Sequence, residues 1–209
     1  RRAIALDLLG KREEAKGFLR NCQGNAMCVH LLGKLSLEEG NSKEALVVLE
    51  TGWANFGSVV PRIGMLLCEA MIHEHRIDEA RALLSKLPDS VDHPRICYLE
   101  GLLHQHEGDY DEALQFYSTA AEGRPEETRF QFRLGYMHSL YGDEESAIEA
   151  YRMCQRSTPL YARAMINLGL LYEDTDRYEE AITCYRMVLL SNPDHNRARL
   201  YLRDAEASQ

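Results

Sequence analysis

The chain has 209 residues, of which 45% are hydrophobic and 27% are charged. These values are typical of a folded protein and exceed the apolar content of disordered chains. Its 33 acidic and 24 basic residues give a formal charge of −9, which excludes a generally basic surface, so no direct nucleic-acid contact is expected from this segment. Charged residues, Gly or Pro interrupt every apolar run before it reaches the ~20 residues of a membrane helix, and no membrane partner is expected.

The first residues bear on whether the chain is part of a longer protein, and the cysteines bear on its cellular compartment. It begins Arg1-Arg2-Ala3-Ile4, without an initiator Met or a signal-peptide pattern, so we expect it to be part of a longer protein. The cysteines are dispersed, with no Cys-x-x-Cys pair and no nearby His that would complete a zinc site. This pattern favours a reducing compartment, and we expect a cytoplasmic protein with no metal and no cofactor. The six cysteines are Cys22, Cys28, Cys68, Cys97, Cys154 and Cys184.

A five-residue motif recurs along the chain at a spacing of 34 residues. It consists of a glycine, a turn residue, an alanine, a tyrosine and a proline, and tandem copies in register predict a repeat architecture. The three best copies are Gly101, Gly108, Ala113, Tyr117 and Pro125; Gly135, Gly142, Ala147, Tyr151 and Pro159; and Gly169, Asp176, Ala181, Tyr185 and Pro193.

The repeats are expected to be pairs of helices. Apolar residues recur at the helical spacing i, i+3, i+4 and i+7 in both halves of a repeat. The turn glycine ends the first helix, and the proline ends the second. The sequence therefore predicts an all-α chain that forms a single solenoid over residues 1–209. In chain order its elements are a truncated repeat at 1–25, complete repeats at 26–59, 61–93, 94–127, 128–161 and 162–195, and a terminal helix at 196–209.

The motif resembles the tetratricopeptide repeat (TPR) family. Asn167-Leu168-Gly169 followed by Tyr172, and Tyr178-Glu179-Glu180-Ala181-Ile182 followed by Tyr185 and Pro193, are similar to its consensus. The resemblance implies a right-handed superhelix of helix-turn-helix repeats with a C-terminal capping helix, which acts as a protein- or peptide-binding scaffold. Departures from the family pattern are Glu100 at an apolar position, His75 and Asp176 at the turn glycine, and Gly57 at the terminal proline.

Two segments of the chain resemble particular groups of TPR proteins. Arg129 and Arg133 look like part of the carboxylate clamp of chaperone-binding TPR proteins, but the preceding repeats lack the expected Lys and Asn residues. Residues 192–208 resemble bacterial proteins in which TPR repeats precede a module like the C-terminal domain of the RNA polymerase α subunit. That resemblance implies an alternative function, in which the segment is a regulatory or substrate-recruiting arm of a larger enzyme or transcription-associated protein.

Motifs for catalysis or metal binding are weak. No phosphate loop, nucleophile elbow or zinc-protease motif is found, so we do not expect an enzyme. The pairs His73/His75 and His104/His106 could hold a metal only across repeats, because residues two apart do not share a helix face. Cys22, Cys68, Cys97 and Cys154 are interpreted as small buried hydrophobes.

One position of the repeat carries arginine five times, at intervals of 33 or 34 residues. In TPR proteins this position lies on the face of the first helix that lines the concave groove. In this chain the neighbouring positions of that face hold aromatic or polar residues. Guanidinium groups bind carboxylates and exposed apolar surface favours interaction, so we expect a partner peptide with acidic and hydrophobic residues. The groove residues are Arg62, Arg95, Arg129, Arg163, Arg197, Tyr98, Phe132, Arg133, Tyr136, Asn167 and Tyr201.

Two other interpretations of these residues stay open. The arginines could pair with acidic side chains of the preceding helix, and the aromatics could pack between repeats. The same surface could also be a homodimer interface, since the sequence leaves the oligomeric state undetermined.

Overall fold

The computed structural model describes residues 6–7, 10–22, 24–57, 59–88, 92–156 and 158–208. Over these ranges the protein consists of twelve α-helices, α2 to α13, and contains no strand, so the all-α prediction is confirmed. Part of the predicted truncated repeat at 1–25 lies outside the described residues. The chain divides into two compact units, residues 1–109 and 110–209. The interpretation of the whole chain as one solenoid stays a prediction.

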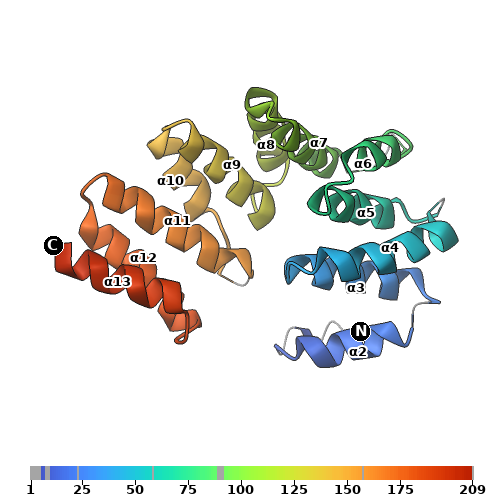
Figure 1. Ribbon diagram of the computed structural model, residues 1–209, viewed down its shortest axis with the longest axis horizontal. Coiled ribbons are helices and arrows are strands. Elements are labelled where there is room, and N and C mark those ends of the chain that lie inside the picture. The colour runs from blue at the N-terminus through green and yellow to red at the C-terminus, as the bar shows by residue number, and fades with distance from the viewer. Residues whose placement is uncertain are drawn as a thin grey trace. The chain divides into compact units, whose positions relative to one another are not determined.

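The first unit is a stack of antiparallel helices. Helix α4 packs against both α3 and α5, and α5 packs against α6 and α7 (Figure 1). Helix α5 is almost entirely buried, because helices contact it on several sides. The helices of this unit are α2 (Arg12–Arg20), α3 (Ala26–Glu38), α4 (Ser42–Phe56), α5 (Pro61–His73), α6 (Ile77–Leu84) and α7 (His93–Glu107).

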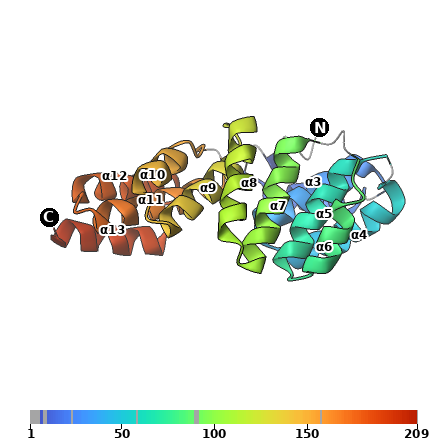
Figure 2. The same ribbon diagram turned by 90° about the horizontal axis from the view of Figure 1, so that it is seen from above.

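The second unit repeats the arrangement. Helices α11, α12 and α13 lie side by side in both views (Figures 1 and 2), and α9 contacts α8, α10 and α11. Tyr151, Tyr172 and Tyr185 are buried in its core with the motif alanines Ala147 and Ala181. The helices of this unit are α8 (Tyr110–Gly123), α9 (Thr128–Leu140), α10 (Glu144–Arg152), α11 (Leu160–Asp174), α12 (Tyr178–Ser191) and α13 (Asn196–Ser208).

The motif glycines have two different structural roles. Gly142, in the turn between α9 and α10, has a φ of 71°, a left-handed conformation that glycine adopts without steric cost. His75 and Asp176, which replace the turn glycine, have the same conformation, with φ of 61° and 58°. In the middle of α11, Gly169 instead lies directly against the ring of Tyr185, so that an added Cβ would overlap the ring.

The cysteines follow the prediction with one exception. Cys68, Cys97 and Cys154 are buried as expected, and Cys184 is buried as well. The expectation for Cys22 is wrong, because this residue is only partly buried. Helix α2 ends at Arg20, so Cys22 lies in the turn beyond the helix and leaves the packing face that the repeat spacing assigned to it.

Candidate functional site

The two predicted groove arginines of the first unit have different environments. Arg62, at the start of α5, is exposed and forms no ion pair with any residue that the structure describes. Arg95, at the start of α7, is 14% exposed and lies 3.6 Å from the carboxylate of Glu69, which is 4% exposed. The hydroxyl of Tyr98 donates a hydrogen bond to the same carboxylate at 3.4 Å. Arg95 and Tyr98 therefore compensate a buried charge on α5.

In the second unit Arg129 also has a carboxylate partner. Its side chain is 14% exposed, and its Nε lies 3.2 Å from Glu127, just before α9. This local pair spans only two residues. Arg129 therefore has a carboxylate partner next to it in the sequence.

Arg163 on α11 has two other arginines near it, Arg133 on α9 and Arg197 on α13, and we call the three residues the arginine cluster. The guanidinium of Arg163 lies over the ring of Phe132, 5.1 Å from its centre. Partial burial, followed by the positive charges of Arg133 and Arg197, lowers the pKa of Arg163. Arg133 and Arg197 are therefore near enough to Arg163 to disfavour its charged form.

The arginine cluster lacks compensating negative charge at two of its members. Neither Arg163 nor Arg197 forms an ion pair with a carboxylate in the described part of the chain. Arg197 donates instead to the hydroxyl of Tyr201 at 3.0 Å, and its guanidinium lies 5.6 Å from the centre of that ring. An anion placed between these groups would relieve their mutual repulsion and accept charge-assisted hydrogen bonds. Carboxylate and phosphate are anions with this hydrogen-bonding chemistry.

Some of the aromatic residues predicted to line the groove are buried in the core, and others are partly exposed at the surface. Phe132 is 5% exposed and packs against Tyr151, and the side chain of Asn167 donates to the Tyr151 hydroxyl at 3.1 Å. Tyr136 and Tyr201 keep part of their surface exposed. The predicted apolar lining is thus narrower than the sequence implied, because Phe132 faces the interior of the unit.

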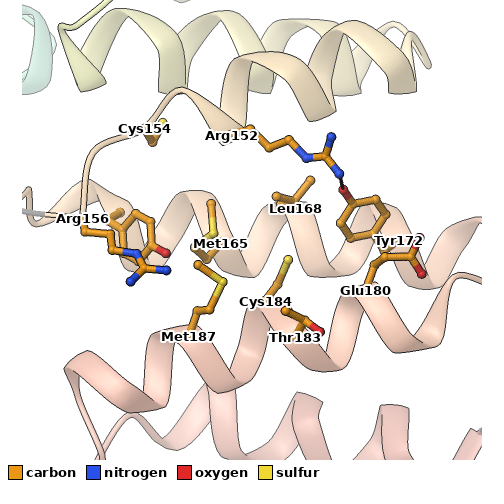
Figure 3. A pocket seen from close by; sticks show the side chains of 11 residues that line it. Arg152, Cys154, Arg156, Met165, Leu168, Tyr172, Glu180, Thr183, Cys184 and Met187 are labelled. Carbon is orange, nitrogen blue, oxygen red and sulfur yellow. Dashed lines mark hydrogen bonds between the residues drawn. The ribbon is translucent and has the colours of Figure 1, made fainter.

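A cavity of about 350 Å³ opens among α10, α11 and α12, and sequence reasoning did not predict it (Figure 3). Met165, Leu168 and other apolar side chains form its walls. At one end Arg152 donates a hydrogen bond of 2.7 Å to the hydroxyl of Tyr172. The buried hydroxyl of Tyr161 has no hydrogen-bond partner in the parts of the chain described. The cavity depends on packing between helices, which no sequence motif indicates.

Two of the histidines meet across repeats, and one group of possible metal ligands is found among the described residues. His75 contacts His106, with ring centres 5.0 Å apart. The possible ligand atoms of His104, Glu107 and Asp109 lie within 4.8 Å of one another. However, both carboxylate oxygens of Glu107 accept hydrogen bonds from Arg81, at 2.7 and 2.8 Å, so an arginine already balances that charge.

Comparisons with known proteins match part of the chain to a repeat family. Two family models, both described as the tetratricopeptide repeat, match residues 98–162 and 162–195. No curated protein matches the sequence. None of the matches supports the resemblance to proteins with an RNA polymerase α module. Among the described residues, no helix is both long and apolar enough to cross a membrane.

Three solved structures illustrate the likeness of fold. A TPR protein from Parabacteroides merdae has a TM-score of 0.72 and 14% identity, and the match covers 98% of this chain and 81% of that one. The Thermus thermophilus TPR protein TTC0263 has a TM-score of 0.67 and 16% identity, with 88% and 100% covered. YrrB, described as a TPR protein with an unusual peptide-binding site, has a TM-score of 0.53 and 17% identity, with 87% and 94% covered.

These matches and the helix pairs lead to one conclusion about family. The fold is that of TPR superhelical proteins. Residues 98–195 therefore match the tetratricopeptide repeat directly.

Proposed function

We propose that the second unit binds a peptide or protein segment through the arginine cluster. The observation that carries the proposal is that Arg163, over the Phe132 ring, and Arg197, beside the Tyr201 hydroxyl, have no carboxylate partner among the described residues. In a chain with a net charge of −9, Arg133 and Arg197 add positive charge near Arg163. Maintaining this repulsion is unfavourable unless a ligand compensates it.

The surroundings of the cluster define the chemistry of the partner. Tyr136 and Tyr201 are partly exposed, and Leu200 on α13 is 47% exposed, so apolar contacts are available beside the charges. The partner we propose carries at least two acidic residues together with aromatic or aliphatic ones. The peptide-binding site described for YrrB supports the proposal by analogy of fold alone.

The proposal is tested by selecting ligands from random displayed peptides with the 209-residue chain. We expect the selected peptides to be enriched in Asp and Glu next to hydrophobic residues. Arg163→Ala and Arg197→Ala should each weaken a selected peptide by about 5- to 30-fold, as truncation of an interface arginine typically does. Arg186→Ala is the matched control, because Arg186 is an exposed arginine of the same unit that pairs with Glu206.

The salt dependence of the affinity distinguishes binding by charge from binding by apolar contacts. Raising the salt to about 1 M shortens the screening length to about 3 Å, so the wild-type affinity should fall while that of the double variant Arg163→Ala/Arg197→Ala changes little. Selection of peptides without acidic residues, or equal loss of binding in the Arg186→Ala control, would count against the proposal.

A further inference from the structure

Two cysteine thiols of the first unit lie close together. The Sγ atoms of Cys22 and Cys28 are 2.9 Å apart, and the Cys28 thiol donates to the Cys22 sulfur. Cys22 lies in the turn after α2, and Cys28 lies in the first turn of α3. The pairing follows from the short connection between two helices that pack against each other.

The other cysteines have different environments. Cys68, Cys97, Cys154 and Cys184 are buried, whereas Cys22 and Cys28 are both partly exposed. Burial raises the pKa of Cys68 and of Cys154 to about 12, which suppresses their reactive thiolate form. Their thiols donate to backbone carbonyl oxygens. A small oxidant can therefore reach Cys22 and Cys28 while the four buried thiols stay protected.

We propose that Cys22 and Cys28 are a modification site, at which they form a reversible intramolecular disulfide by exchange with a small-molecule disulfide. In the first step the Cys22 thiolate attacks one sulfur of the small disulfide and releases one thiolate. In the second step the Cys28 thiolate attacks the Cys22 sulfur and releases the other thiolate. The two protons lost by the cysteines convert the released thiolates to thiols. The protein dithiol is thus oxidised as the small disulfide is reduced.

The geometry gives the two cysteines their order in the reaction. The Cys28 thiol points at the Cys22 sulfur and donates to it, so Cys28 is placed to attack Cys22 once Cys22 has formed the mixed disulfide. Burial, together with the neighbouring Cys22, raises the pKa of Cys28 to about 11. Part of that increase comes from Cys22, and it disappears once Cys22 is capped as a mixed disulfide, which helps Cys28 to ionise for the second step.

The experiment treats the native 209-residue chain with oxidised glutathione and measures its intact mass. We expect the wild type to lose two hydrogens and a proteolytic digest to contain one Cys22–Cys28 cross-link. In Cys28→Ser the reaction should stop at a glutathione adduct on Cys22, because the resolving thiol is missing. Cys97→Ser is the matched control and should behave like the wild type, since Cys97 is buried.

Each outcome is informative about the pair. Reduction with dithiothreitol should restore the original mass and both free thiols. Stable glutathione adducts on the wild type without the internal cross-link would overturn the proposal, as would cross-links that involve Cys68, Cys97, Cys154 or Cys184 in the folded protein. A wild type that stays fully reduced in excess oxidised glutathione, while its denatured form reacts, would overturn it as well.

Discussion

The guanidinium of Arg163 lies 5.1 Å from the centre of the Phe132 ring and so connects α11 to α9. The equivalent arginine of the first unit, Arg95, lies 3.6 Å from the buried carboxylate of Glu69. The same repeat position therefore supports two roles. A cation over an aromatic ring at an exposed site contributes about 0.5–1 kcal/mol, whereas removing one partner of a buried ion pair costs more.

Substitution of the two arginines should separate these roles. Arg95→Ala should lower the free energy of unfolding by about 1–3 kcal/mol, because the Glu69 carboxylate loses a cation while it stays buried. Arg163→Ala should change it by less than about 1 kcal/mol. Urea denaturation followed by circular dichroism measures both. Equal destabilisation by the two substitutions would mean that Arg163 is structural as well.

Gly169→Ala should destabilise the second unit by about 1–3 kcal/mol, since the new methyl group would overlap the Tyr185 ring and force the core to shift. Gly17→Ala is the matched control. Gly17 lies within α2, and nothing stands within 4 Å of its missing Cβ. Alanine should therefore stabilise the protein there by about 0.5–1 kcal/mol through its higher helix propensity. Thermal unfolding of both variants should show shifts of opposite sign.

Tyr161→Phe should stabilise the protein by up to about 1 kcal/mol. The Tyr161 hydroxyl is buried without a hydrogen-bond partner in the described residues, so its removal ends a desolvation cost. Tyr151→Phe provides the contrast, because the Tyr151 hydroxyl accepts a hydrogen bond from Asn167, and its loss should destabilise. Chemical denaturation distinguishes the two, and a loss of stability in Tyr161→Phe would show that the hydroxyl has a partner in solution.

Acid should weaken the contact between α2 and α4. Burial raises the pKa of Glu44, but hydrogen bonds from Lys16, Arg20 and Ser36 outweigh it and lower the value to about 2. A carboxyl with a lowered folded-state pKa stabilises the protein above its unfolded pKa of about 4.5 and loses this contribution as the pH falls toward 2. Solvent screening limits the effect to about 1 kcal/mol.

The pH dependence of unfolding between pH 5 and about 2 measures this contribution. Glu44→Gln should have lower stability at pH 7 and a shallower acid dependence than the wild type. Glu14→Gln is a suitable control, because Glu14 is exposed and pairs only with the exposed Lys11 among the described residues. A wild type and a Glu44→Gln variant with parallel pH profiles would contradict the role of Glu44.

Much of the fold could be predicted because local interactions determine it. A turn residue in the left-handed conformation ends a helix wherever it occurs. Gly142 and Asp176, at the same position of two successive repeats, therefore mark equivalent turns. The close approach of Gly169 to Tyr185 likewise follows from one repeat motif. Local spacing also explains the wrong prediction for Cys22. The repeat spacing predicts that Cys22 lies on a helix, but α2 ends at Arg20, so Cys22 lies beyond it.

The sequence by itself determined the helix pairs, their order and the recurrence of arginine at one position, because each depends on periodicity and on turn chemistry within a single repeat. Only the tertiary structure decided what each arginine contacts. Arg95 meets Glu69, Arg129 meets Glu127, and Arg163 is close to like charges and an aromatic ring. The physical reason is that a charge's energy depends on neighbours from other helices and on its exposure to water, and neither quantity is encoded at the position itself.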